Sequence, residues 1–236
     1  MTTTAVLFDL DDTLFDHQGC TRAALCALHA RHAAFRAWSF DQFDAAHRSL
    51  LEALHVDVLA GRLTVDEARV RRFRSLVEQA GGEPSDALAR TIAAKYREVY
   101  VAHWQPVRGA LALLQALRGR VATGVVTNNV AAEQQQKIDA CGFRPWLDAI
   151  VISEQAGVSK PDPRIFAIAL DRLGHPPQTA VMVGDAWDAD IAGAMAAGIH
   201  PIWFNRFGAE SPDPAVPEIH SLEPAETIAE LILNPL

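Results

Sequence analysis

The stretch AVLFDLDDTLFD, residues 5–16, decides the fold because an apolar run leads directly into three carboxylates within four positions. Short apolar runs without polar alternation are typical of strands buried on both faces, as in a parallel sheet. Open α/β sheets bind ligands at the carboxyl ends of such strands. Because side chains two positions apart on an extended chain point the same way, we expect Asp9 and Asp11 to share one pocket.

Similar apolar runs return in the second half of the chain, at residues 121–127, 149–153, 180–185 and 199–205. Helical patterns separate them, at 130–141 between an Asn129 cap and Gly142, at 162–173 after the cap Asp162 and before Gly174, and at 191–197 before Gly198. Caps, a proline at the first helical position and a closing glycine are ordinary helix signals. The alternation predicts an α/β fold with a doubly wound parallel sheet.

Residues 17–104 break this alternation with about 90 residues of helix-like sequence, rich in Ala, Leu, Arg and Glu, with breaks near Gly61 and at 81–84. We predict an all-helical domain at 17–104, inserted into an α/β core formed by residues 1–16 and 105–236. The proline-rich segment from about residue 208 is expected to cross the surface before a short final helix.

Composition excludes several classes of protein. The chain has 236 residues, of which 50% are hydrophobic and 21% charged, so neither wholesale disorder nor a disulfide miniprotein is expected. Its three cysteines form no C-x-x-C pair, and no apolar run or leader pattern indicates a membrane span or signal peptide. We therefore expect a soluble, cytoplasmic protein.

The net charge of −8 argues against a nucleic-acid polymer as the main partner, because phosphate backbones require a basic surface. The charge is uneven: residues 17–104 hold 12 basic and 10 acidic residues, whereas the rest hold 9 and 19. The acidic part could hold a cation. The sequence leaves open whether the protein is a monomer or a homodimer.

Polar residues follow three of the other predicted strands. The second strand ends at Thr127-Asn128, Lys160 stands just before the helix at 162–173, and the fourth strand ends at Asp185, with Asp190 five residues later. Each of these motifs alone is weak evidence for a functional site, since threonine and asparagine also cap helices and a loop lysine is usually solvated. Together they place carboxylates, a cation and hydrogen-bond donors at one edge, and carboxylate oxygens are what Mg²⁺ prefers.

In this order, Asp-x-Asp-x-Thr, strand-Thr, Lys-Pro and Gly-Asp-x₄-Asp, the chain resembles the haloacid dehalogenase superfamily over nearly its whole length. The matching residues are Asp9, Asp11, Thr13, Thr127, Lys160, Asp185 and Asp190. The helical insertion resembles the cap of the subfamily that contains phosphoglycolate phosphatase, β-phosphoglucomutase and the dehalogenases. More narrowly, the motifs are similar to those of pyrimidine 5'-nucleotidases and N-acylneuraminate-9-phosphatases.

The resemblance implies a Mg²⁺-dependent phosphatase acting on a small phosphorylated metabolite. Asp9 would attack phosphorus to form an aspartyl phosphate, and Asp11 would act as acid and then as base. Mg²⁺ would be held by Asp9, the backbone carbonyl of Asp11 and Asp185, with Asp190 as a direct ligand or behind one. Lys160 would fix Asp9 and the phosphoryl oxygens, while Thr127 and the Asn128 amide would hydrogen-bond the transferring group.

Other readings stay open at this point. A phosphomutase would use the same aspartyl phosphate but pass it to a sugar. A 2-haloacid dehalogenase is disfavoured by Asp11, since halide leaves without a proton. A phospho-receiver domain would be about half this length and lack the insertion, and a binding-only pseudoenzyme would not need the full polar set.

Substrate choice is expected from the inserted domain, closing over the site. The candidate residues there are His17, Gln18, His55, Arg69, Arg71, Arg72 and Arg74. For each arginine, an exposed and solvated helix face is the simpler interpretation. Trp187 could stack on a base, although packing is the commoner role of a tryptophan. Cys141 is expected in the core.

Overall fold

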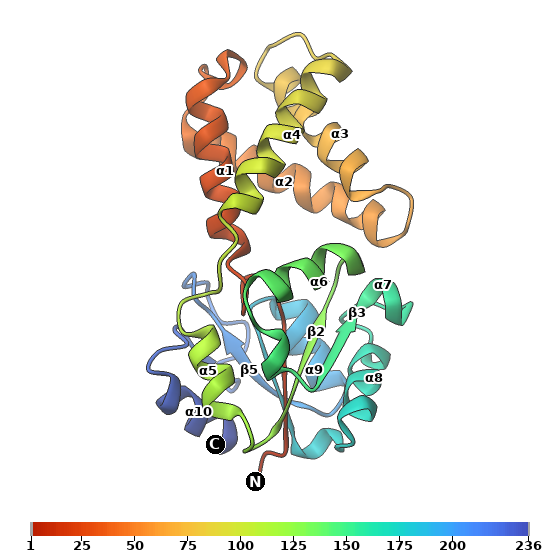
Figure 1. The fold of residues 1–236 in the computed structure, drawn as a ribbon, viewed down its shortest axis with the longest axis vertical. Helices are drawn as coiled ribbons and strands as arrows, with labels where there is room; N and C mark the ends of the chain where they lie inside the picture. Colours follow the sequence, from red (N-terminus) through yellow and green to blue (C-terminus); the bar gives the residue numbers. More distant parts are fainter. Residues whose placement is uncertain (1, 236) are drawn as a thin grey trace. The chain divides into compact units, whose positions relative to one another are not determined.

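The computed structural model describes residues 2–235, and the chain divides into two compact units (Figure 1). The α/β unit consists of Met1–Asp16 and Gln105–Leu236. The helical unit consists of His17–Trp104. Each unit has its own core and is described separately below.

The α/β unit is built on a six-stranded sheet in the order β3-β2-β1-β4-β5-β6, and all neighbouring strands are parallel. The predicted α/β class with a parallel sheet is confirmed. The strands are β1 Ala5–Phe8, β2 Ala122–Thr127, β3 Ala149–Ile152, β4 Ala180–Gly184, β5 His200–Phe204 and β6 Glu218–Ile219.

Strand β1 lies in the middle of the sheet and sets the register of the edge where Asp9 emerges. Phe8 is aligned with Val125 of β2 and with Val183 of β4. The backbone N–H of Asp9 continues the ladder by donating to the carbonyl of Val183 at 3.0 Å. The residues that follow β1, β2 and β4 therefore emerge together at one edge of the sheet.

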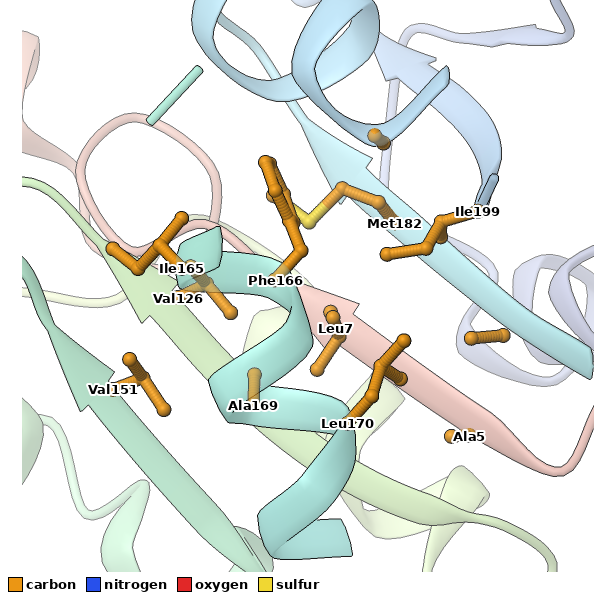
Figure 2. Packing of buried hydrophobic residues seen from close by; sticks show 12 residues of the cluster. Ala5, Leu7, Val126, Val151, Ile165, Phe166, Ala169, Leu170, Met182 and Ile199 are labelled. Atoms are coloured by element: carbon orange, nitrogen blue, oxygen red, sulfur yellow. The ribbon is translucent and has the colours of Figure 1, made fainter. Parts of the chain in front are cut away.

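Helices cover both faces of the sheet. Ala5 and Leu7 pack against helix α8, Pro163–Leu173, in a cluster that also contains Ile165 and Phe166 (Figure 2). Val6 and Phe8 alternate with them and point to the opposite face, where they are equally buried. Helices α5, Ala110–Leu117, and α10, Ala225–Leu233, pack against each other in the same unit.

The expected helix at 162–173 is confirmed at both ends. The Asp162 side chain accepts from the N–H of Arg164 at 2.9 Å, and Gly174 closes the helix with φ 75°. A left-handed residue at this position satisfies the last carbonyls, and only glycine adopts it without strain. The short final helix is also found, as α10.

Three local expectations differ from the structure. Helix α6, Ala131–Ala140, begins after Val130, so Asn129 lies one residue before the cap and instead accepts from the Val130 N–H. The region predicted as one helix at 191–197 is a π-helical turn η4, Trp187–Ala192, followed by the short α9, Gly193–Ala196. The proline-rich segment contributes the two-residue strand β6, which no local pattern indicates.

The remaining short elements of the α/β unit connect these layers. They are η2 Arg144–Trp146, α7 Ser153–Ala156 and η3 Pro177–Thr179. Cys141 is 7% exposed, as expected for a core residue.

The helical unit contains four helices, with bounds α1 His17–Arg31, α2 Phe40–Leu59, α3 Val65–Gln79 and α4 Asp86–Ala102, and a short turn η1, Ala33–Phe35. Two of them begin with a capping box. Ser39 and Gln42 exchange side-chain and backbone hydrogen bonds at α2, and Thr64 and Glu67 do so at α3. No helix among residues 2–235 is both long and apolar enough to cross a bilayer.

Candidate active site

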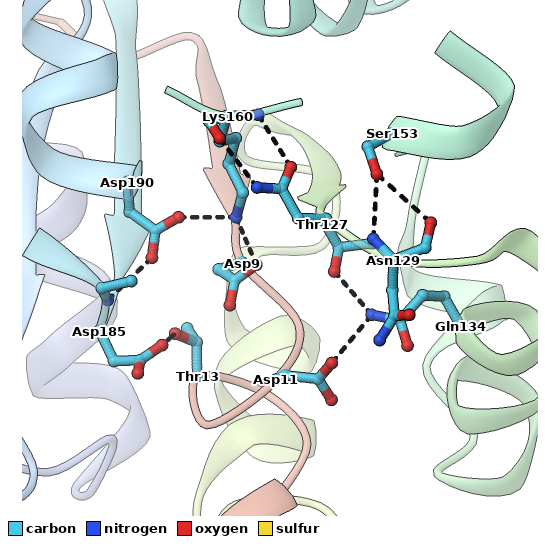
Figure 3. A network of polar contacts seen from close by, with 12 residues as sticks. Asp9, Asp11, Thr13, Thr127, Asn129, Gln134, Ser153, Lys160, Asp185 and Asp190 are labelled. Atoms are coloured by element: carbon cyan, nitrogen blue, oxygen red, sulfur yellow. Dashed lines mark hydrogen bonds and ion pairs between the residues drawn. The ribbon is translucent and has the colours of Figure 1, made fainter. Parts of the chain in front are cut away.

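Asp9 and Lys160 form the centre of the site, at the carboxyl end of β1. Asp9 is 7% exposed, and its Oδ1 accepts a hydrogen bond of 2.5 Å from the Lys160 ammonium group. The same ammonium donates to Oδ1 of Asp190 at 2.6 Å (Figure 3). One buried cation is thus shared by two buried carboxylates that come from distant segments.

The π-helical turn η4 brings Asp190 into the site. Asp190 is fully buried, and its second oxygen accepts from the N–H of Ala186 at 3.0 Å. Gly184, the last residue of β4, leaves room for this carboxylate, since a Cβ there would lie 2.3 Å from Asp190 Oδ2. A π-helical turn is rare and often occurs at functional sites. The glycine of the Gly-Asp motif is therefore a steric requirement of the site.

Asp185 is oriented from two sides. The Thr13 hydroxyl donates to Asp185 Oδ1 at 3.0 Å, and Trp203 Nε1 donates to its backbone carbonyl at 2.9 Å. Thr13 reaches this position because the chain turns at Asp12, whose φ of 63° is left-handed. Aspartate is among the residues that tolerate this conformation.

The electrostatics of the site show an excess of negative charge. Burial raises the pKa of Asp9 to about 7; Lys160 partly offsets this, and Asp190 adds to it. Burial likewise raises the pKa of Asp185 well above its usual value, with further repulsion from Asp9 and Asp190. For Lys160, burial disfavours the charge, but Asp190 and Asp9 outweigh it and hold the pKa above its usual range. One resident cation does not balance three carboxylates.

The donor set fits Mg²⁺. Asp9, Asp185 and Asp190 each offer a carboxylate oxygen, and these atoms lie within 4.8 Å of one another. Asp190 already accepts on both oxygens, which favours a role in orienting Lys160 rather than direct ligation. Oxygen ligands are those that Mg²⁺ prefers. The Asp11 side chain is not one of these three groups. The expected binding of Mg²⁺ by the backbone carbonyl of Asp11 stays a prediction.

Asp11 lies at the same edge but turns toward helix α6. Its carboxylate accepts from Lys137 Nζ at 2.7 and 3.0 Å and from Gln134 Nε2 at 3.0 Å. The Gln134 amide also donates to Thr127 Oγ1 at 2.7 Å. Sequence reasoning missed Gln134 and Lys137. Their signal was present: at helical spacing, positions 134, 137, 138 and 141 share one face, so two polar residues occupy the buried side of a helix.

Asn128 holds the Lys160 loop in place. Its side chain accepts from the Lys160 N–H at 2.8 Å and donates to the Lys160 carbonyl at 2.9 Å. The side chain of Asn128 therefore positions the lysine, and its contact with a phosphoryl group stays a prediction. Ser153 supports the neighbouring turn by accepting from the Asn129 N–H at 3.0 Å.

We expect the cation-free protein to lose stability as pH rises from about 4 to about 7. Asp9, with a pKa of about 7, and Asp185 both bind protons in the folded state at pH values where the unfolded carboxyls, with pKa about 3.9, have lost them. The folded state then binds more protons, so the free energy of unfolding falls with pH across this window. Mg²⁺ binds the carboxylate form and should reduce the fall.

Thermal melts at pH 5 and pH 7.5, in EDTA and in Mg²⁺, check this prediction. Asp9→Asn, which removes one titrating carboxyl, is the matched variant and should show a smaller decrease in Tm in EDTA. An equal decrease in Asp9→Asn and the wild type would contradict it.

The candidates in the helical unit have different environments. Arg69 and Arg72 are buried, at 7% and 5% exposure, so the expectation of a solvated arginine face is wrong for these two. Arg71 and Arg74 are exposed and line a cleft of about 430 Å³. His17 Nδ1 lies 2.7 Å from the hydroxyl of Tyr100. Their role in substrate choice stays a prediction, as do those of Gln18 and His55.

Trp187 packs with other apolar side chains. Its ring meets that of Trp203 edge-on, with centroids 5.1 Å apart, and the pair belongs to a cluster with Ile191 and Val216. This contact accounts for Trp187 as a packing residue.

The chain is similar to known proteins in sequence and in fold. Residues 3–198 match the model of a family described as haloacid dehalogenase-like hydrolase. The pyrimidine 5'-nucleotidase YjjG of Escherichia coli (strain K12) is 34% identical, over 92% of this chain and 95% of the relative. A glyceraldehyde 3-phosphate phosphatase of Methanopyrus kandleri is 33% identical, over 86% and 84%. The solved structure of the HAD-hydrolase YfnB from Bacillus subtilis, bound to magnesium, has a TM-score of 0.76 and 27% identity, covering 97% of this chain and 99% of that one.

Proposed function

The chain belongs to the haloacid dehalogenase-like hydrolase family, and on this premise we propose that it is a Mg²⁺-dependent phosphatase of small phosphate monoesters. The proposal extends to an aspartyl phosphate on Asp9 and to a 5'-nucleotide as the preferred substrate class. Relatives named for a nucleotidase and a phosphatase support the reaction, and the first of them supports the substrate class.

One observation carries the proposal: Asp9 is held at 2.5 Å by Lys160 while a second carboxylate, Asp11, stands at the same edge. A phosphate monoester dianion repels nucleophiles, so its cleavage needs an aligned attacking oxygen and nearby positive charge. Lys160 supplies both alignment and charge. The second carboxylate is needed for an alcohol, which leaves as an alkoxide, but not for a halide.

The chain's own residues account for the bonds and protons that change in the two steps of the reaction. The step starts from the form of the enzyme in which Asp11 carries a proton. An oxygen of Asp9 bonds to phosphorus, the ester P–O bond breaks, and its electron pair stays on the departing oxygen, which takes that proton from Asp11. Water then attacks phosphorus and gives a proton to Asp11, releasing inorganic phosphate and restoring the Asp9 carboxylate. The Thr127 hydroxyl and the Lys160 ammonium donate to the phosphoryl oxygens.

Mg²⁺ would be held by Asp9 and Asp185, with Asp190 behind them, and would supply charge neutralisation between the nucleophile and the phosphate. The raised pKa values of Asp9 and Asp185 support this, since burial and then repulsion from neighbouring carboxylates disfavour their charged forms, which a bound cation would stabilise.

The test is release of inorganic phosphate from a panel of esters with Mg²⁺: UMP, dUMP, phosphoglycolate, phosphoserine and sugar phosphates. We expect turnover with one or more of them, highest with the nucleotides, and loss of turnover in excess EDTA that Mg²⁺ restores. Hydrolysis that survives EDTA, or none with any ester, would contradict the proposal. Turnover that requires a sugar bisphosphate would instead indicate a phosphomutase.

A further inference from the structure

Two of the three lysines of this chain lie beside candidate catalytic carboxylates. The 21 basic residues comprise 18 arginines and Lys95, Lys137 and Lys160. Lys137, on helix α6, has 1% of its side chain exposed. A buried ammonium group is costly to remove from water unless it is paired and hydrogen-bonded. A methionine would fill the same space without that cost, so the charge at position 137 needs an explanation.

Lys137 is bound chiefly to Asp11. Its Nζ donates to both oxygens of that carboxylate, at 2.7 and 3.0 Å, and lies farther, at 3.8 Å, from Glu133. The ammonium also lies 5.0 Å from the ring centroid of Phe15. The Asp11 side chain is 24% exposed, so it lies between the buried lysine and solvent. Lys137 therefore supports from behind a carboxylate that remains accessible.

Gln134 stands one turn earlier on the same face of α6 and is fully buried. Figure 3 shows its amide between Asp11 and Thr127, donating to both. When ionised, the Asp11 carboxylate accepts on both oxygens, so the nitrogen of the amide is assigned to face it. Because the Thr127 oxygen accepts from Gln134, the hydroxyl proton of Thr127 points elsewhere and can be donated to another acceptor.

Resting on the phosphatase function proposed above, we propose that Lys137 and Gln134 are positioning residues for this reaction. As Asp11 gives its proton to the departing oxygen, negative charge develops on the Asp11 carboxylate. Lys137 and Gln134 already donate to that carboxylate, so they stabilise the developing charge without reorganisation.

Gln134 has a second effect, through Thr127. By occupying the oxygen of the Thr127 hydroxyl, it directs the proton of that hydroxyl toward a phosphoryl oxygen. One face of α6 thus serves both the leaving group, through Asp11, and the transferring group, through Thr127.

Esters with different leaving groups distinguish the role through Asp11 from the role through Thr127. We compare kcat/KM for the best alkyl ester of the panel with kcat/KM for p-nitrophenyl phosphate, whose phenolate departs without a proton. This quantity covers only the steps through departure of the leaving group, so hydrolysis of the phosphorylated Asp9 does not enter. Lys137→Met should lower it about 100-fold for the alkyl ester, within the usual range of acid catalysis, and less than about 5-fold for the aryl ester.

A double-mutant cycle tests whether Lys137 acts through Asp11. In the Asp11→Asn background, Lys137→Met should change kcat/KM for the alkyl ester by less than about 2-fold, because residues that act through one another are not additive. An equal loss with both esters in the single variant, or a full loss in the Asp11→Asn background, would overturn the role of Lys137. The double variant removes both charges of the Lys137–Asp11 pair, so it leaves no unpaired charge at Lys137 and guards against a variant that fails to fold.

Gln134→Leu should lower kcat/KM about 10-fold for the aryl ester, because Thr127 acts on the phosphoryl group that both esters share. The loss should be larger for the alkyl ester, because Gln134 also donates to Asp11. Gln136→Leu, at an exposed position on the same helix, is the matched control and should leave both values unchanged. Equal behaviour of Gln134→Leu and Gln136→Leu would overturn the role of Gln134. Failure of the wild type with every ester would instead refute the phosphatase function itself.

Discussion

Asp9→Asn is expected to abolish phosphate release while the protein stays folded. An amide nitrogen or oxygen does not replace the attacking carboxylate, and loss of a nucleophile reduces kcat by about 10⁴-fold or more. The substitution keeps the side-chain volume and removes one of three crowded acidic groups, Asp9, Asp185 and Asp190. We therefore expect no decrease in Tm at neutral pH in EDTA.

Phosphate release and thermal melts on the same preparations check this expectation. The matched control is Asp171→Asn, an exposed aspartate on α8, which should retain full activity. In the wild type, acid quenching during turnover followed by peptide mass analysis should find a phosphoryl group on the peptide that contains Asp9. Activity of Asp9→Asn within tenfold of the wild type would remove Asp9 as the nucleophile.

Lys160→Met is expected to damage both activity and stability. The Lys160 ammonium lies 2.5 Å from Asp9 and 2.6 Å from Asp190, and all three side chains are buried. Removing one partner of a buried ion pair leaves uncompensated charge and costs about 3–5 kcal/mol. Loss of a cation that aligns the nucleophile and donates to the phosphoryl group should lower kcat by about 10²- to 10³-fold.

The stability loss of Lys160→Met should depend on pH. Without the lysine, the pKa of Asp9 rises further, so the folded state binds protons to a higher pH and is penalised most at neutral pH. We therefore expect a smaller decrease in Tm at pH 5 than at pH 7.5. Lys95→Met, at a partly exposed lysine paired with Glu98, is the control and should change Tm little at either pH. If Lys160→Met had the same Tm as the wild type at pH 7.5, Lys160 would not be the cation that stabilises these buried carboxylates.

Local patterns predicted much of the framework because their causes lie within a few residues. The apolar runs around Ala5 and Val125 form strands since each residue is buried on one face or the other. Helix α8 begins and ends where Asp162 and Gly174 indicate, because capping satisfies backbone groups only one or two turns away. The segments that carry Asp9, Thr127, Lys160 and Asp185 were identified in the same way.

Only the tertiary structure decided which partner each charged group finds. Lys160 pairs with Asp9 across 151 positions, and Lys137 pairs with Asp11 across 126, so neither contact leaves a local pattern. The burial of Arg69 and Arg72 likewise depends on how α3 packs within the helical unit. The sequence by itself determined where chain segments become strands, helices and polar ends, since these depend on near neighbours. Strand register and the π-helical turn at Asp190 decided which ends meet, because that choice depends on packing between distant segments.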